Sequence, residues 1–135
     1  MSQWLLIPAL IGVALLVWRL FAMLKGDVLQ RLNESRRSTS RLVSRGELVD
    51  GSRHVDVAMA LSDSALYYEN ADMQASLDLK WIEEIDYDNE LATGQAVSRG
   101  KVMRLRCFST VFEFILPEAS VQQWELHLPP LRQGA

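Results

Sequence analysis

The residues of this 135-residue chain with the most obvious chemical potential are carboxylates gathered between positions 78 and 90. The stretch Asp86-Tyr87-Asp88-Asn89-Glu90 superficially suggests a calcium loop, but it lacks the glycine and the terminal glutamate of the EF-hand spacing. If the segment is a strand, Asp86, Asp88 and Glu90 project from one face. We expect that face to be solvated, and a site for a cation or for a basic partner is the alternative.

Two arginines form a second charged group. Arg104 and Arg106 alternate with an apolar set that ends in Cys107, so they belong to the opposite face of a predicted strand. We expect both arginines at the surface, where they can touch the acidic strand or a partner. Cys107 shares the apolar side, which predicts a buried thiol rather than a nucleophile.

No arrangement of residues indicates an enzyme. His54 and His127 are isolated, and Cys107 is the single cysteine, so no spacing fits a zinc site. No Ser-His-Asp set and no glycine-rich phosphate loop can be assembled. We therefore expect no enzymatic activity, no cofactor and no metal. Nucleic-acid binding is not expected either, because the chain has no basic footprint outside its N-terminal third.

The N-terminal residues read as a membrane anchor. From Trp4 to Leu24 the only charged side chain is Arg19. About 20 apolar residues suffice for a helix to cross a hydrocarbon layer of ~30 Å. Trp4 and Trp18 suit the two interfaces, and Arg19 can extend back to the interface or meet a charge on another membrane subunit. The pattern predicts a single transmembrane helix over residues 1–24.

Charge divides the chain into two unlike parts. Residues 1–45 hold seven basic and two acidic side chains, a net charge of +5, whereas residues 46–135 hold seven and fifteen, a net charge of −8. The positive-inside rule places the basic side in the cytoplasm and the N-terminus outside, most simply in a bacterial inner membrane. The residues expected to contact the membrane or anionic lipid are Trp4, Trp18, Arg19, Lys25, Arg31, Arg36, Arg37, Arg41 and Arg45.

After the anchor, the spacing of apolar residues changes from helical to alternating. Residues 25–40 form a basic juxtamembrane linker, in which Val28, Leu29 and Leu32 share one helical face. From residue 41 the apolar residues alternate, which predicts strands. The expected strands are 55–61, 65–69, 77–80, 101–108 and 110–116; 82–87 fits a strand or a helical turn, and 89–100 is a polar loop.

A short helix is expected to close the domain. Pro117 suits its start, and Val121, Trp124 and Leu128 give it one apolar stripe. Residues 129–135 are predicted to be a flexible tail after this helix. The side chains expected to supply aromatic bulk to the core are Tyr67, Tyr68, Trp81, Phe112, Phe114 and Trp124.

Several short antiparallel strands followed by one amphipathic helix resemble the pleckstrin-homology-like (PH-like) superfold, especially GRAM-type and bacterial PH-like domains. The residues that carry the resemblance are the hairpin Val55–Tyr68, the segment Leu77–Ile85 and the helix around Trp124. The resemblance implies an α+β, mainly β fold over residues 41–128, an antiparallel barrel capped by the C-terminal helix. Its family-level function is recognition of phosphoinositides or other membrane lipids, although many PH-like domains bind proteins.

Lipid-binding members of this superfold place several basic residues around the first hairpin loop. Here that loop is expected near Gly46–His54, where Glu47 and Asp50 face only Arg53 and His54. An acidic domain repels anionic lipid. The sequence therefore favours a membrane-anchored adaptor or scaffold that binds a protein, with a membrane protein as the expected partner. Its possible partner contacts are Arg104, Arg106, Asp86, Asp88 and Glu90.

Two other functions remain open at this point. The chain can be a small structural or assembly subunit of a larger membrane complex, with Arg19 and Gly12 as contact positions. It can also be a peripheral sensor of anionic lipid. An exposed strand edge would in addition allow a homo-oligomer.

Overall fold

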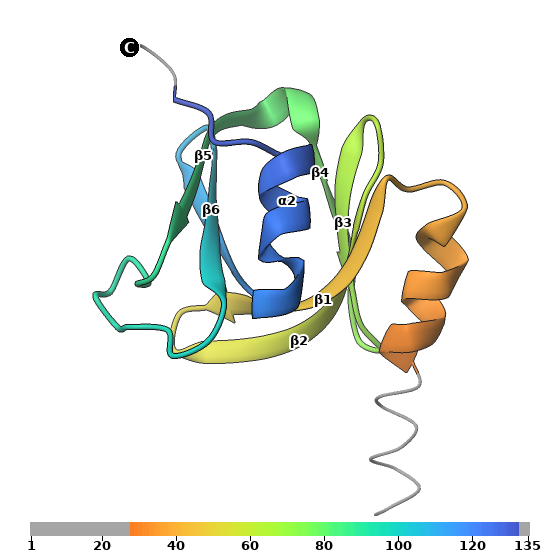
Figure 1. The fold of residues 1–135 in the computed structure, drawn as a ribbon, viewed down its shortest axis with the longest axis horizontal. Helices are drawn as coiled ribbons and strands as arrows, with labels where there is room; N and C mark the ends of the chain where they lie inside the picture. The colour runs from red at the N-terminus through yellow and green to blue at the C-terminus, as the bar shows by residue number, and fades with distance from the viewer. Residues whose placement is uncertain (1–27, 133–135) are drawn as a thin grey trace, which may run out of the picture.

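The computed structural model of the chain describes residues 28–132, and Figure 1 shows its fold. The predicted anchor over residues 1–24, with Trp4, Trp18 and Arg19, lies outside the described residues, and so does Lys25. Among residues 28–132, no helix is long and apolar enough to cross a membrane.

Seven antiparallel strands form one sheet in the order β4-β3-β2-β1-β7-β6-β5. A helical segment at residues 28–37, called the linker helix below, precedes the sheet, and the helix α2 follows it. The elements are β1 Leu42–Asp50, β2 Arg53–Leu61, β3 Ala65–Glu69, β4 Gln74–Asp78, the 3-10 turn η1 Leu79–Trp81, β5 Ile82–Asp88, β6 Lys101–Cys107, β7 Thr110–Leu116, the 3-10 turn η2 Glu118–Ser120 and α2 Val121–His127.

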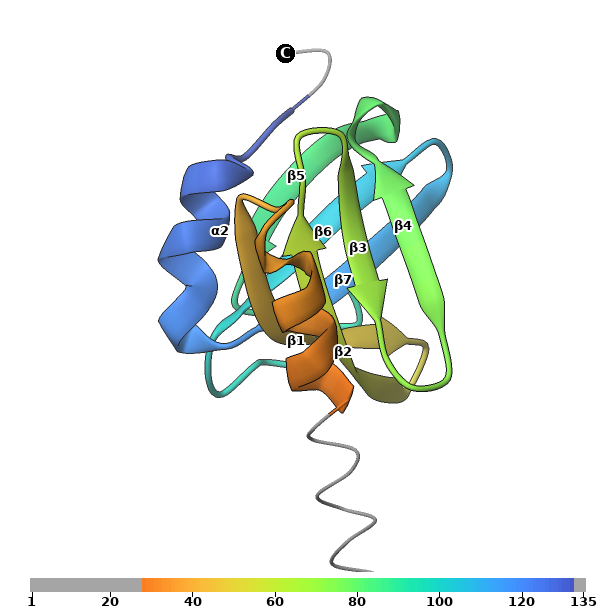
Figure 2. The same cartoon turned by 90° about the vertical axis from the view of Figure 1, so that its right-hand side faces the viewer.

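The sheet curls into a half-barrel, and α2 lies over its concave side (Figures 1 and 2). Side chains such as Met59, Leu105 and Phe114 point inward and are fully buried. Trp124 of α2 is fully buried among them, and its indole N–H donates to Ser44 Oγ on β1 at 2.9 Å. The structure confirms a mainly β domain with a C-terminal helix whose tryptophan closes the core.

Most of the predicted strands form where the sequence places them. In the β2–β3 hairpin, the hydroxyl of Ser62 accepts hydrogen bonds from the backbone N–H groups of Ser64 (3.3 Å) and Ala65 (3.0 Å). A serine that satisfies the backbone of a tight turn favours reversal of the chain. The segment that fits a strand or a helical turn becomes β5, because β6 offers it backbone partners along its length.

The first hairpin differs from its prediction. The loop expected near Gly46–His54 shrinks to Gly51 and Ser52, because β1 and β2 pair out to Asp50 and Arg53. Gly51 has a φ of 60°, which suits a two-residue turn between long strands. Gly46 lies inside β1 instead, where a Cβ would come within 2.4 Å of a methionine sulfur on β2. This glycine permits close packing and does not mark a loop.

The prediction that Trp81 belongs to the core is wrong. Trp81 is 50% exposed, whereas Tyr68, Phe114 and Trp124 are buried. The carboxylate of Asp78 accepts the backbone N–H of Lys80 at 2.9 Å and starts η1, which interrupts the period-two alternation before β5. The turn therefore leaves the indole of Trp81 outside the sheet.

The C-terminal segment after α2 pairs with the sheet. Leu131 and Ile85 exchange both backbone hydrogen bonds, at 2.9 and 3.0 Å, so Leu131 forms an antiparallel bridge to the edge of β5. Within the residues described, the segment expected to be a flexible tail over 129–135 is thus attached to the sheet through Leu131. Residues 133–135 lie outside the described part of the chain.

Candidate functional site

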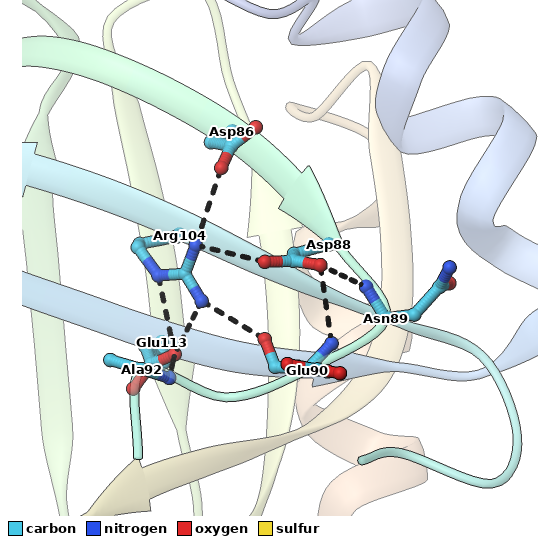
Figure 3. A network of polar contacts seen from close by, with 7 residues as sticks. All are labelled: Asp86, Asp88, Asn89, Glu90, Ala92, Arg104 and Glu113. Atoms are coloured by element: carbon cyan, nitrogen blue, oxygen red, sulfur yellow. Dashed lines mark hydrogen bonds and ion pairs between the residues drawn. The ribbon is translucent and has the colours of Figure 1, made fainter. Parts of the chain in front are cut away.

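Arg104 on β6 is the centre of a polar network on the outer face of β5–β7 (Figure 3). Its guanidinium lies 3.2 Å from a carboxylate oxygen of Asp86 and 3.5 Å from one of Asp88 on β5, and 3.2 Å from Glu113 on β7. The backbone N–H of Asn89 donates to Asp88 at 2.7 Å, and this bond chiefly holds the pKa of Asp88 below its ordinary value. One arginine thus joins three neighbouring strands.

The same network holds the loop 89–100 against the sheet. Arg104 donates to the backbone oxygen of Glu90 at 3.0 Å, and Glu113 accepts the backbone N–H of Ala92 at 2.9 Å. Leu91, between these two contacts, is buried. The arrangement fastens a polar loop through charged groups that would otherwise face solvent.

The residues predicted to contact a partner are therefore brought together, but they bind one another. Asp86, Asp88 and Arg104 form ion pairs, and Glu90 contributes its backbone oxygen rather than its carboxylate. Glu113 was not predicted. The strands were predicted as 101–108 and 110–116, whereas the structure ends β6 at Cys107; the resulting two-residue turn places Glu113 opposite Arg104.

Arg106 is also engaged within the domain. Its guanidinium lies 2.8 Å from Glu84 and 3.6 Å from Glu83, both at the start of β5. These pairs are half-exposed and contribute at most about 1 kcal/mol each. Both arginines of the predicted basic pair thus satisfy acidic groups of their own sheet.

Arg36 of the linker helix attaches that helix to β3. Its guanidinium lies over the ring of Tyr67, 3.8 Å from the centroid, and its Nε donates to Glu69. Glu69 is only 3% exposed, and its second oxygen accepts from Gln74 at 3.0 Å. Burial opposes the charged form of Glu69, but the two side-chain hydrogen bonds outweigh it and hold its pKa below the ordinary value.

The other described arginines predicted to contact lipid take different positions. Arg41 forms an ion pair with Asp63 in the β2–β3 turn, so it too is engaged by the domain. Arg31 and Arg37 are exposed on the linker helix, and Arg45 is exposed on β1. Within the predicted basic linker over residues 25–40, Arg36 thus contacts the sheet, and Arg41, at the start of the predicted domain, is paired as well.

An open pocket of about 450 Å³ lies between the β1–β2 hairpin and the loop after β5. Arg45 and Arg99 on its wall carry positive charge, and His54 Nδ1 lies 3.5 Å from the carboxylate of Glu47. Ser98 lines the same pocket, but no hydrogen bond joins it to His54. The pocket thus combines two arginines with a histidine–carboxylate pair.

The remaining reactive groups are structural. Cys107 is buried, as predicted, and burial raises the pKa of its thiol, which keeps it neutral and unreactive. Tyr87 donates its buried hydroxyl to the backbone oxygen of Leu128 at 2.7 Å, and burial raises its pKa as well. Among residues 28–132, no three histidine, cysteine or acidic side chains group as metal ligands.

An apolar surface forms at the end of the half-barrel where β4 passes into β5. Trp81, Phe108 and Val111 are 50%, 65% and 48% exposed. Ile82 pairs with Cys107, and Trp81 and Phe108 are the residues just beyond this pair, in η1 and in the β6–β7 turn. Phe108 has a φ of 57°, which is uncommon for an aromatic residue and places it at the tip of the β6–β7 turn. We call these three residues the apolar tip.

Comparison with known proteins adds no relative: no family model, no curated protein and no solved structure matches this chain. Function must therefore be inferred from the chain's own residues. Of the surfaces above, the ion-pair network and the linker contacts are satisfied internally. The apolar tip holds three of the five large hydrophobic residues that are exposed among residues 28–132, and it includes both exposed aromatic ones; the other two are Leu126 on α2 and Leu131.

Proposed function

We propose that this chain is a membrane-anchored, protein-binding module that presents a PH-like domain at the cytoplasmic face of a membrane. The curled antiparallel sheet with its C-terminal helix supports the PH-like assignment. The apolar run from Trp4 to Leu24, followed by basic residues, supports a single-pass anchor with the domain on the cytoplasmic side.

The position of the linker helix supports one orientation of the domain in this proposal, with the start of that helix toward the membrane. Only residues 25–27 separate the predicted anchor from the described chain, and three residues span at most ~10 Å. The linker helix is fixed to β3 through Arg36, so this helix belongs to the same rigid unit as the sheet. The linker helix, orange in Figures 1 and 2, begins at one end of the molecule, and the turn η1, which follows β4, lies at the other. The apolar tip then points away from the membrane that holds the anchor.

The observation that carries the proposal is the apolar tip. Exposed clusters of large apolar side chains mark interaction sites, and tryptophan and phenylalanine are enriched in protein interfaces. Lipid insertion suits the tip poorly, because it faces away from the anchoring membrane and the domain from residue 46 onward has a net charge of −8. Tethering also raises the effective concentration of the domain toward other membrane proteins.

Site-specific photo-cross-linking of the full chain in native membranes tests the proposal. A photoreactive phenylalanine analogue replaces Phe108, and Leu126, an exposed leucine on α2, receives the same analogue as the matched control. We expect discrete protein adducts from position 108, fewer from position 126, and loss of the adducts when Trp81→Ser is added.

Other outcomes would replace the proposal. Lipid adducts from position 108 would favour the lipid sensor. Protein adducts from a probe at Gly12 in the predicted anchor, with none from position 108, would favour an assembly subunit that acts through its membrane helix. Equal adducts from positions 108 and 126 would show that the apolar tip has no specific partner.

A further inference from the structure

The strand β4 has one backbone side without a partner among the described residues. In the sheet order it neighbours β3 alone. The backbone N–H of Leu79 donates to the backbone oxygen of Ser64 at 3.0 Å, and this bond shows which residues of β4 are hydrogen-bonded to β3. Because bonding alternates along an antiparallel strand, every second residue of β4 directs its N–H and C=O away from β3. The outward positions are Gln74, Ser76 and Asp78.

The opposite edge of the sheet is covered at one position. Leu131 exchanges two hydrogen bonds with Ile85, so the chain adds a short piece of itself to β5. The edge of β4 has neither such a cover nor a proline, lysine or bulge of the kind that blocks strand addition. In the described sheet it is therefore open to a further strand along its whole length.

The side chains of β4 specify what such a strand must look like. Ala75 and Leu77 point toward the core, and Leu77 is buried, whereas Ser76 and Asp78 belong to the outer face. Residues opposite one another on antiparallel strands share a face. A strand added to β4 must therefore place apolar side chains beside Ala75 and Leu77 and polar ones beside Ser76 and Asp78.

The acidic charge around this edge favours basic side chains at the polar positions of the added strand. Residues 63–84 hold six acidic side chains and one basic one, Lys80. Asp63 and Glu69 are paired with arginines from residues 36–41, but Asp72 and Asp78 form no ion pair among the described residues. Lysine or arginine on the outer side of an added strand would complement these two carboxylates.

The edge also leads directly to the apolar tip. Asp78 ends β4, and η1 separates it from the exposed Trp81 by two residues, so the indole is within reach of a strand that continues past Asp78. Backbone pairing and an aromatic anchor thus form one continuous surface. Strand addition gains affinity from backbone hydrogen bonds and specificity from alternate side chains.

A second copy of this chain fits the edge poorly. Antiparallel pairing of β4 with itself requires a two-fold axis perpendicular to the strand. β4 runs from the end of the domain that holds residue 28 toward the end that holds η1 (Figure 2). Such an axis reverses the second domain relative to the first and brings a second Asp72 and Asp78 to the same edge, where like charges oppose pairing.

We infer that the open edge of β4 accepts an extended segment of a partner protein, in which apolar residues alternate with lysine or arginine, and that an apolar residue at one end of this segment contacts Trp81. The inference rests on the proposed protein-binding function and adds the recognition surface and the chemistry of the ligand.

The test selects ligands for the full chain in nanodiscs of phosphatidylcholine, with a phage-displayed library of random 12-residue peptides as the probe. The decisive variant is Ser76→Pro, which removes an outward N–H without removing a bond to β3. Ser76→Thr is the matched control, because it keeps the N–H and changes only the side chain. Thermal unfolding of both variants checks that the domain remains folded.

We expect enriched peptides to alternate apolar and basic residues and to bind Ser76→Pro at least tenfold more weakly than Ser76→Thr. Binding should also weaken at high salt, as charge pairing requires. If Ser76→Pro does not fold, the amide exchange of Ser76 and Asp78 in the unmodified chain replaces it, and saturating peptide should slow both amides.

Three results would overturn the inference. Enriched peptides that lose binding with Trp81→Ser but not with Ser76→Pro would leave the protein-binding function intact and remove the strand edge from it. A dimer in the nanodisc that Ser76→Pro dissociates would assign the edge to a second copy. No enrichment over empty nanodiscs would reject peptide addition, and the cross-linking from position 108 would then decide separately whether the domain binds proteins.

Discussion

The two edges of the sheet differ in how their backbone groups are satisfied. At β5, Leu131 pairs with Ile85, and the hydroxyl of Tyr87 binds the end of α2. At β4, the outward groups around Ser76 have no partner among residues 28–132, and Trp81 beside them is half-exposed. A few residues after a helix are enough to cover an edge, so an edge that stays open next to an exposed tryptophan is a candidate for binding.

The neighbourhood of the two edges differs in charge as well. Next to β5, Arg104 and Arg106 neutralise the carboxylates of the sheet. Next to β4, Asp72 and Asp78 lack an arginine. The closed side therefore stabilises the fold, whereas the open side retains the charge and the backbone groups with which a ligand can interact.

The largest expected effect is on the closed side. Arg104→Met should destabilise the domain by about 2–3 kcal/mol, because it leaves Glu113 and the backbone oxygen of Glu90 without their charged donor. Arg106→Met is the matched control and should cost less than about 1 kcal/mol, since its partners are more exposed. Urea unfolding measures both, and equal costs would show that Arg104 does not hold the loop.

A smaller effect is expected where the closed edge meets α2. Tyr87→Phe removes the hydroxyl that donates to Leu128 O at 2.7 Å and leaves that oxygen with an unmet hydrogen bond. We expect a loss of about 1–2 kcal/mol in the free energy of unfolding and faster amide exchange at Leu131. Unchanged exchange at Leu131 would mean that the C-terminal segment is held by its own pairing alone.

Much of this architecture could be predicted from the sequence, and the errors have physical causes. Alternation identified β2, β3, β6 and β7, and the spacing of Val121, Trp124 and Leu128 identified the stripe of α2. The alternation of buried and exposed side chains does not continue to Trp81, because a 3-10 turn capped by Asp78 lies between the two strands. No local pattern marks such a turn.

The candidate surfaces were only partly predictable. Charge alternation brought Arg104 and the acidic strand to one face, but it did not show that they satisfy each other. Pairing depends on register between strands, and register is a property of the folded sheet. The open edge of β4 depends on strand order, which one sequence without relatives does not specify.

Acid should weaken the bond between Arg36 and Glu69 that holds the linker helix to β3. The pKa of Glu69 is lower in the folded protein than in the unfolded chain, so its bond to Arg36 contributes stability above about pH 4.5, and this stability is lost as the pH falls through the folded-state pKa. Glu69→Gln should cost about 1 kcal/mol near pH 7 and remove this part of the acid dependence. Unfolding of both proteins between pH 3 and 7 measures the difference, and parallel pH profiles would contradict the assignment.

The smallest effect is expected at the open edge itself, where a pair of prolines compares the two edges directly. Leu131→Pro removes an N–H that donates to Ile85 and should cost about 1 kcal/mol. Ser76→Pro removes an N–H that has no partner in the sheet and should cost no more than about 0.5 kcal/mol. Urea unfolding of the two variants in the same buffer gives the comparison. A cost at Ser76 equal to that at Leu131 would mean that the edge of β4 is already paired within the chain, which would remove the physical basis for strand addition there.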